Sequence, residues 1–477
     1  MLHLHALRAA RPRQLRARAL RPVARRRFPR GEPPHEAEPI PAARELWASP
    51  AFEASSPPDA STRLGRFHRQ YGDDVLTAAR AGDVAEARRL ISTWIEAHPP
   101  HVGDAWHPYP LSTRAGNWVA ALTLEPELAS AELSRSLWLQ LLRLERTVED
   151  DVLGNHVIRN ARALVLGGTA FGAAELTRRG IEILRRELPE QILRDGGHYE
   201  RSPAYHLVVL RDLLEVQAAS PHSWLADAID RMRIFAAALA RPDGVPALFN
   251  DGTADAPRLE LPAAPEGVAV FDASGFVVVR DGPLWLAFRC GQAAPAFLPA
   301  HAHADALSLH LWWDGRPVLV DPGTFTYEAG ADRDWFRATR AHSTVCVDGR
   351  DQFRLWGSFR SGPLPKVALR YAREQAVEAS VVLPGRIRHV RRIEWEGNEV
   401  QIHDRLEGSG RHRVESRLVW APEPPPVELE VLGPGELRTE EAWVSERFGE
   451  RVSTTAAAVF TELELPASLG FRLRCLD

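Results

Sequence analysis

The chain has 477 residues, more than a single hydrophobic core usually supports, so we expect at least two large domains. Its apolar content of 45%, charged content of 26% and net charge of −4 are typical of a globular protein and give no indication of nucleic-acid binding. Three widely spaced cysteines exclude a disulfide framework, and the sequence has no continuous apolar run of about 18 residues that could cross a membrane.

Residues 1–65 are predicted to form an N-terminal arm and linker rich in arginine and proline. Residues 1–30 contain ten arginines and no acid, but no apolar stretch of the kind that a secretory signal requires, which favours a cytoplasmic location. The arm could make a peripheral contact with anionic lipid, polysaccharide or protein; we favour the alternative, a strap over the acidic surface of its own chain. Residues 31–60 are typical of a linker or of an extended segment that follows the surface.

Helical periodicity dominates residues 66–260. Apolar residues recur at helical spacing in segments 75–95, 133–144, 157–165 and 176–188. Two more helices are expected, one that starts at Ser202-Pro203 and one from Ser223 to Ala240. Because the loops are short and no strands intervene, the pattern predicts stacked antiparallel hairpins, either a bundle or an α/α toroid.

Residues 261–477 show the pattern of an antiparallel β-sandwich. Strand-like runs at 276–279 and 284–288 are joined by a turn at 280–283, and a second pair of runs, 309–313 and 318–320, is joined in the same way. Further runs between 367 and 420 continue this pattern. The fold class is therefore multidomain α+β, with the helical domain first.

Two stretches of the helical half carry unusually many polar residues. Asn155-His156 directly precedes a predicted helix, where Asn155 would ordinarily serve as the N-cap. The second stretch, 195–206, ends at the start of the next helix. It contains His198, Tyr199, Arg201 and Tyr205. Such residues at a helix start are often packing residues, so both a structural and a catalytic role remain open for each stretch.

A third group lies in the sandwich half. His301, His303 and Asp305 alternate along a segment predicted to be extended, so their side chains should share one face. His303 can converge with Asp321 and His342, and two imidazoles with one carboxylate suit a divalent metal, which leaves His301 for acid–base chemistry. The alternatives are a hydrogen-bonded cluster that locks loops and a cupin-type site. A cupin would need a glutamate soon after the second histidine, and none follows closely.

These motifs resemble the heparinase II/III family of polysaccharide lyases from about residue 70 to the C-terminus. The matching residues are Asn155-His156, 195–206, 301–308, 320–327, Arg333, 336–339, 341–345 and 347–349. The resemblance implies an α/α toroid, incomplete here, followed by a β-sandwich. It also implies β-elimination on a uronic-acid-containing polysaccharide, which could be heparin- or heparan-like, alginate-like or a bacterial exopolysaccharide. Ser343 departs from the family pattern, which usually has asparagine there.

The resemblance also implies a role for each residue. Asn155, assisted by His156, would neutralise the uronate carboxylate. Tyr205 would be the acid, and would serve as both acid and base if the two groups lie on the same side of the sugar; in the opposite arrangement His301 or His156 would be the base. Substrate would be bound by His198, Tyr199, Arg201 and Arg337, while His303, Asp321 and His342 would hold a structural metal, zinc or calcium, with the two imidazoles favouring zinc.

Two further alternatives remain from the sequence. The chain could be a non-catalytic glycan-binding or exopolysaccharide-assembly protein that uses the same cleft. Degradative lyases of this family usually act in the periplasm or outside the cell, which is the alternative to the cytoplasmic location.

Overall fold

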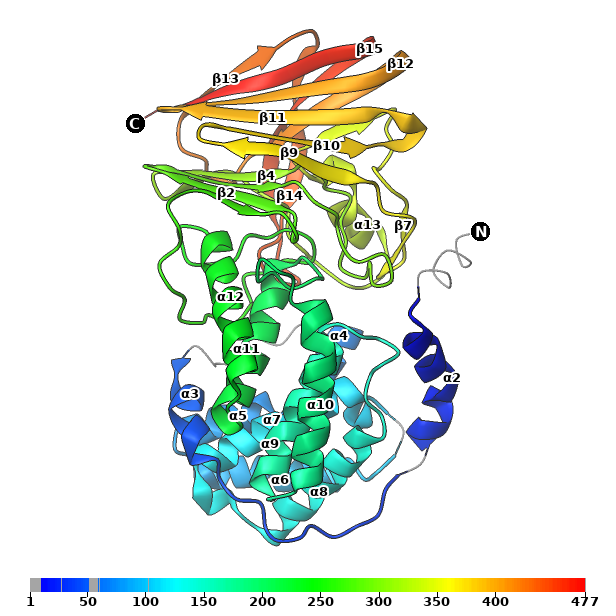
Figure 1. Cartoon of the computed structure of the whole chain (residues 1–477), viewed down its shortest axis with the longest axis vertical. Coiled ribbons are helices and arrows are strands. Elements are labelled where there is room, and N and C mark those ends of the chain that lie inside the picture. The colour runs from blue at the N-terminus through cyan, green and yellow to red at the C-terminus, as the bar shows by residue number, and fades with distance from the viewer. Residues whose placement is uncertain (1–9, 27, 51–58, 60, 102, 477) are drawn as a thin grey trace.

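The computed structural model describes residues 10–26, 28–50, 59, 61–101 and 103–476. A helical N-terminal region is followed by two stacked antiparallel sheets, which confirms the predicted α+β class (Figure 1). The helices are α2 (Pro12–Arg26), α3 (Arg44–Ala48), α4 (Arg63–His68), α5 (Asp73–Arg80), α6 (Val84–Ala97), α7 (Pro108–Leu124), α8 (Ala131–Glu145), α9 (Asn155–Ala170), α10 (Ala174–Gln191), α11 (Pro203–Ala219), α12 (Ser223–Leu239) and, in the sandwich region, α13 (Ala331–Arg337). Among the described residues, no helix is both long enough and apolar enough to cross a bilayer.

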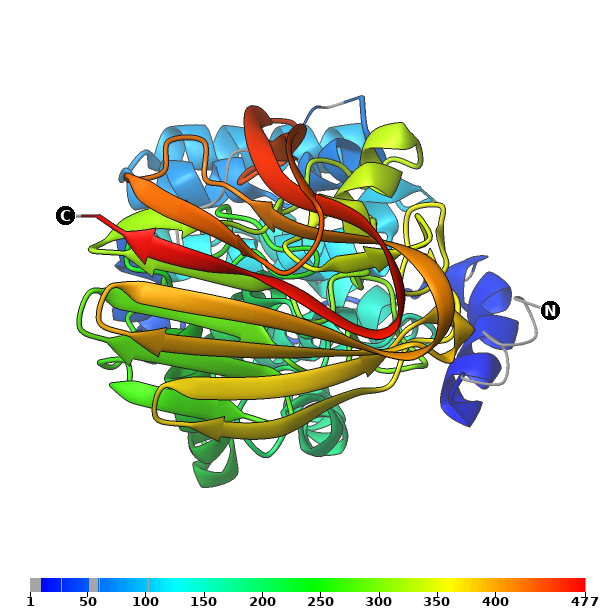
Figure 2. The same ribbon diagram turned by 90° about the horizontal axis from the view of Figure 1, so that it is seen from above.

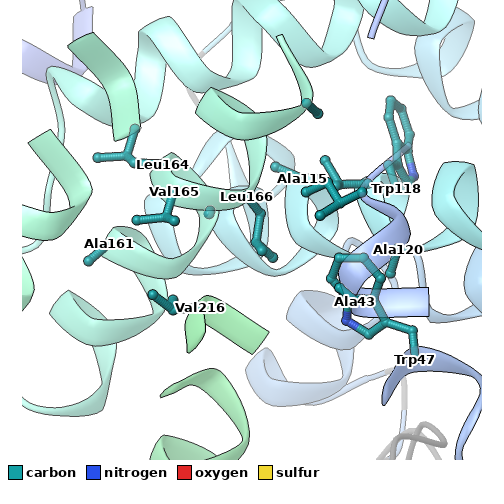
Figure 3. Packing of buried hydrophobic residues seen from close by; sticks show 14 of the residues in the cluster. Ala43, Trp47, Ala115, Trp118, Ala120, Ala161, Leu164, Val165, Leu166 and Val216 are labelled. Atoms are coloured by element: carbon teal, nitrogen blue, oxygen red, sulfur yellow. The ribbon is translucent and has the colours of Figure 1, made fainter. Parts of the chain in front are cut away.

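The helical region is built around α7 and α9. Every residue of α7 except Tyr109 is buried, and α9 packs against α7, α10 and α11. Trp118 of α7, Trp47 of α3 and Leu164 of α9 lie in one apolar cluster (Figure 3). Because α7 has almost no exposed polar face, it shows no amphipathic period in the sequence.

The N-terminal segment is attached to this helical core. Ala37, Ile40 and Trp47 are buried in the core, so this part of the predicted linker is packed; residues 51–58 and 60 lie outside the described residues. Helix α2 (dark blue in Figure 1) lies against the side of the helical region, where Arg13 pairs with Glu187 at 2.6 Å. This arrangement corresponds to the strap, the alternative that the sequence favoured.

The C-terminal region contains two main sheets and a short two-stranded one. The first sheet has the order β1 (Gly267–Phe271), β2 (Phe276–Asp281), β3 (Leu284–Arg289), β4 (Leu309–Trp313) and β5 (Arg316–Leu319), so both predicted hairpins are present. The second has the order β13 (Val427–Leu432), β15 (Val452–Cys475), β12 (Glu399–Val419), β11 (Arg388–Glu396), β10 (Ala376–Val382) and β9 (Val367–Arg373), with β14 (Glu436–Val444) on β15 and β6 (Val345–Val347) on β12. Strands β7 (Leu355–Trp356) and β8 (Arg360–Ser361) form the short third sheet.

Apolar side chains fill the space on both sides of the first sheet. Facing the second sheet, Val277 and Leu286 pack with Ile393 and Ile402; Figure 2 shows the two sheets stacked. On its other face, a separate cluster that includes Trp285 joins the sheet to α12. All six residues of β3 are buried, as expected for a strand covered on both faces. This packing holds the sandwich against the helical region.

Candidate active site

A cleft of about 990 Å³ lies between the helical region and the loops of the sandwich. Side chains of α7, α9 and α11 line one side, and residues of loops 298–301, 327–328 and 358–359 line the other. Asn155, His156, Tyr205 and His301 all belong to its lining. The four residues that the sequence put forward for catalysis are thus brought to one cavity, from both regions of the chain.

The loop before α9 presents Asn155 to the cleft. Leu153 and Gly154 both have positive φ (70° and 63°), and a Cβ on Gly154 would lie 1.9 Å from Glu200 Oε1. Only glycine fits so close to this carboxylate. Tyr199 Oη accepts a hydrogen bond from the Gly154 N–H at 3.0 Å, and this bond helps to fix the loop.

Asn155 is the first residue of α9 and not its N-cap. The N-cap position is Gly154, which makes no side-chain cap, so the capping interpretation of Asn155 is wrong. The Asn155 side chain is 2% exposed, and Oδ1 has no hydrogen-bond partner among the described residues. A buried amide oxygen without a partner is costly in a structural position, and it is available to a ligand in a cleft.

Tyr205, Tyr327 and His301 form a contact network across the cleft. The Tyr205 and Tyr327 hydroxyls are hydrogen-bonded at 2.8 Å, and the Tyr205 ring stacks on the His301 ring at a centroid distance of 4.0 Å. Burial raises the pKa of the Tyr205 phenol, although the bond to Tyr327 opposes the shift. Tyr205 is therefore protonated in the free protein. Its hydroxyl is held by Tyr327, to which no role was assigned from the sequence.

Asp251 organises this side of the cleft, and the sequence reasoning missed it. It is 0% exposed and accepts hydrogen bonds from His301 Nδ1 at 2.8 Å, His303 Nε2 at 2.9 Å and Arg333 Nη2 at 2.9 Å. Burial opposes its charge, but Arg333 and the two imidazoles hold the pKa of this carboxyl well below its usual range. Its only local signal is a turn-like Asn-Asp-Gly that starts at Asn250, a pattern that also occurs without function.

The segment from His301 to Asp305 is a loop and not the expected strand, so its side chains do not share a face. His301 lines the cleft, His303 is buried behind it, and Asp305 pairs with Arg289 at 2.6 Å. His301 and His303 nevertheless meet at the same carboxylate, that of Asp251. The separation of the two histidines, which the alternation could not predict, follows from the turns of this loop.

His303, Asp321 and His342 converge to a buried group whose ligand atoms all lie within 4.8 Å of one another. His303 Nδ1, Asp321 Oδ2 and both ring nitrogens of His342 lack hydrogen-bond partners among the described residues. Burial lowers the pKa of His303 to about 4, so its ring is neutral and has a free electron pair. The residues fit a divalent cation better than a hydrogen-bonded lock, and Asp251 would orient His303 from the outer side.

The four residues predicted to bind substrate do not line the cleft. His198 and Tyr199 are 1% and 3% exposed, and His198 Nε2 is bonded to Gln191 Oε1 at 3.0 Å. Arg201 donates to the Ala273 carbonyl at 3.2 Å, and the 1% exposed Arg337 donates to the Ala302 carbonyl at 3.1 Å. The structure therefore places these four residues outside the cleft lining, with each of them hydrogen-bonded to its own chain, and does not bring them to the four residues put forward for catalysis.

Comparison with known proteins shows which family the chain resembles. Residues 91–264 match the heparinase II/III N-terminus model and residues 263–468 the heparinase II/III-like C-terminal model. A heparin-sulfate lyase of Bacteroides thetaiotaomicron is 25% identical over 61% of this chain and 53% of its own length, and an FtsZ-localized protein C of Caulobacter vibrioides is 27% identical over 66% and 56%.

The structure of a heparinase III superposes with a TM-score of 0.72 at 15% identity, covering 97% of this chain and 89% of that one, which shows a common fold. The sequence matches span little more than half of the length of these relatives, and only 36% of a similar lyase from Bacteroides stercoris. With both family models matched in succession from 91 to 468, the chain belongs to the heparinase II/III family.

Proposed function

We propose that the chain is a polysaccharide lyase that cleaves a uronic-acid-containing polymer by β-elimination. The supporting observation is the meeting of Asn155, His156, Tyr205 and His301 at one cleft. Elimination requires that the uronate carboxylate is neutralised, that the proton on C5 is removed, and that the leaving O4 is protonated. The four side chains supply one candidate group for each requirement.

His301 is the proposed base. Its Nδ1 donates to the Asp251 carboxylate, which leaves the electron pair on Nε2, and the side chain lines the cleft. Tyr205 is the proposed acid because its buried phenol is protonated. The C5 proton passes to His301 as the C4–O4 bond breaks and the C4=C5 double bond forms, and Tyr205 gives its proton to O4. Asn155 and His156 face the carboxylate.

The metal in this proposal is zinc, held by His303, Asp321 and His342. Two imidazoles and one carboxylate favour zinc over calcium, which prefers oxygen ligands. When bound, the ion would hold together the three segments that carry these ligands. It would not act on substrate, because all three ligands are buried. The bond from His303 to Asp251 then links the metal site to the base.

The charges of the cleft favour a polymer with few sulfates. Its described lining contains seven arginines and eight carboxylates, and five of the arginines form ion pairs with acids. The two arginines without an ion pair among the described residues are Arg63 and Arg258. A heavily sulfated chain would need more unpaired cations, whereas one carboxylate per uronate needs only the group around His156.

The test compares initial rates, followed by the ultraviolet absorbance of the unsaturated uronate product, on four polymers. These are unsulfated N-acetylheparosan, heparan sulfate, heparin and alginate. We expect the unsulfated or sparsely sulfated uronans to be cleaved faster than heparin. Faster cleavage of heparin would contradict the charge argument, and no product from any polymer would contradict the lyase proposal.

A second candidate is a non-catalytic glycan-binding or assembly protein. It is favoured by the relative named FtsZ-localized protein C, whose name records a location and not a reaction. Tight binding of a uronan without product in the same assay would support this candidate over the lyase.

A further inference from the structure

Next to His156 lies a buried carboxylate that the proposed mechanism does not use. Glu149, in the loop between α8 and α9, is 0% exposed. Its Oε1 accepts from His156 Nδ1 at 3.2 Å and lies 3.8 Å from His107 Nδ1. Asn160 Nδ2 donates to its Oε2 at 3.2 Å, and the Glu149 N–H donates back to Asn160 Oδ1 at 2.9 Å.

These contacts fix Glu149 in place from two directions. Asn160 lies one helical turn beyond His156 on α9, so the helix that carries the histidine also holds its partner. His156 Nε2 makes no hydrogen bond to a described residue, and 30% of the side chain is exposed in the cleft wall. One ring nitrogen is therefore anchored, and the other is available to a ligand.

The position of His156 would by itself disfavour a positive charge. It lies in the first turn of α9, where the helix dipole is positive. Burial alone would lower the pKa of its imidazole, but the charge of Glu149 and the hydrogen bond to it raise that pKa above its ordinary value. Burial likewise opposes the charge on Glu149, yet His156, His107 and Asn160 lower its pKa to about 2.

The other groups that face His156 do not replace Glu149. The Tyr109 ring of α7 lies 4.3 Å from the imidazole, and Arg159 of α9 opposes its charge. Glu200, in the loop before α11, favours the charge, but burial raises the pKa of this carboxyl. Glu149 is the carboxylate in direct hydrogen-bond contact with the ring.

We propose that Glu149 is a positioning residue that keeps His156 cationic and orients its Nε2 toward the carboxylate of a uronate. The cation would be present before substrate arrives, so no proton has to be taken up when the sugar binds. This preorganised charge opposes the negative charge that builds up on the carboxylate during elimination. The inference rests on the proposed lyase function only in naming the uronate as the anion.

The first test follows the His156 ring by NMR in the full-length protein, with the signal assigned by its loss in His156→Gln. In the unmodified protein the ring should titrate above 6.5, its ordinary value. In Glu149→Gln the midpoint should fall by about 1 to 3 pH units, since an opposite charge at this distance shifts a pKa by that amount. The matched control is Glu187→Gln, a buried carboxylate on α10 outside the cleft lining, which should leave the midpoint unchanged.

The second test is the pH profile of kcat/KM on a uronan. The alkaline limb should move toward acid by the same amount in Glu149→Gln, so that the rate at mildly alkaline pH falls about tenfold or more and recovers when the pH is lowered. A merely structural role would lower the rate at every pH.

The inference is overturned by an unchanged midpoint in Glu149→Gln, or by a midpoint below 6.5 in the unmodified protein. The second result is measured on the unmodified protein alone, so it can be obtained even if Glu149→Gln does not fold. A shifted midpoint without cleavage of any uronan overturns the proposed function and leaves the cationic His156 standing. Cleavage of a uronan with an unshifted midpoint supports the proposed function and overturns the role of Glu149.

Discussion

Replacing Asp251 by asparagine tests how the two regions are joined at the site. The carboxylate is fully buried and binds Arg333, whose side chain is also 0% exposed, as well as His301 and His303. The asparagine side chain would keep the shape but remove the charge, leaving the guanidinium buried and uncompensated. Loss of one partner of a buried ion pair costs about 3–5 kcal/mol, and the Ser358 carbonyl, which accepts from Arg333 Nε at 3.0 Å, offsets little of it.

The free energy of unfolding should be measured by denaturant titration for the unmodified chain, Asp251→Asn and Asp348→Asn. Asp348 is a suitable control because it accepts from His412 Nδ1 at 2.9 Å, in the same kind of pair, but is 33% exposed. Its replacement should cost less than about 1 kcal/mol. Asp251→Asn should also lower kcat, on the order of 10³-fold, because His301 loses the acceptor that fixes its tautomer.

Equal stability losses in Asp251→Asn and Asp348→Asn would refute the reasoning, since burial and the charge of Arg333 are what separate the two aspartates. A large loss of stability with full activity in Asp251→Asn would support the stabilising role of the Asp251–Arg333 ion pair but contradict the role of Asp251 in orienting His301.

Three further predictions follow from the same geometry. His303→Ala should lose the metal, measured by elemental analysis, and unfold at lower denaturant, whereas His301→Ala should keep the metal and lose activity; equal metal contents would contradict this division. Tyr327→Phe removes the 2.8 Å bond to the Tyr205 hydroxyl and should lower kcat about tenfold with little change in KM, and an unchanged kcat would show that Tyr205 needs no such support. The pKa of Glu149 is lowered from 4.5 to about 2, so its contribution to stability is fully present above pH 4.5 and is lost as the pH falls toward 2. The difference in the free energy of unfolding between Glu149→Gln and the unmodified chain should therefore narrow from pH 4.5 to pH 2. A constant difference over that range would contradict the lowered pKa of Glu149.

Helices and strands with one exposed face could be predicted from the sequence. Ser202 caps α11 by accepting from the Tyr205 N–H, as its place before Pro203 indicated, and α12 starts at Ser223 as expected. Helix α7 was missed because it is buried on nearly all sides, so its apolar period is hidden. Strand β12 continues through Gly408 and Gly410, where its register with β15 shifts between Leu406 and Gly410, although two glycines so close together usually indicate a turn.

The candidate site was predictable only where residue type and spacing restrict the chemistry. The convergence of His303, Asp321 and His342 followed from their types, since few other roles need two imidazoles and a carboxylate. Asp251 and Glu149 could not be found in this way, because each acts through contacts that only the folded chain makes. The same limit applies to Arg337, for which the resemblance implies substrate binding although its guanidinium donates to backbone carbonyls.

The most direct test of the lyase proposal is mass spectrometry of the products formed from an unsulfated uronan in water enriched in heavy oxygen. Elimination breaks the C4–O4 bond without adding water. For the lyase proposal we therefore expect a product with an unsaturated uronate at its new non-reducing end and no solvent oxygen, formed by the unmodified chain and not by Tyr205→Phe. A product that carries heavy oxygen, or no product while the uronan binds tightly, would contradict it.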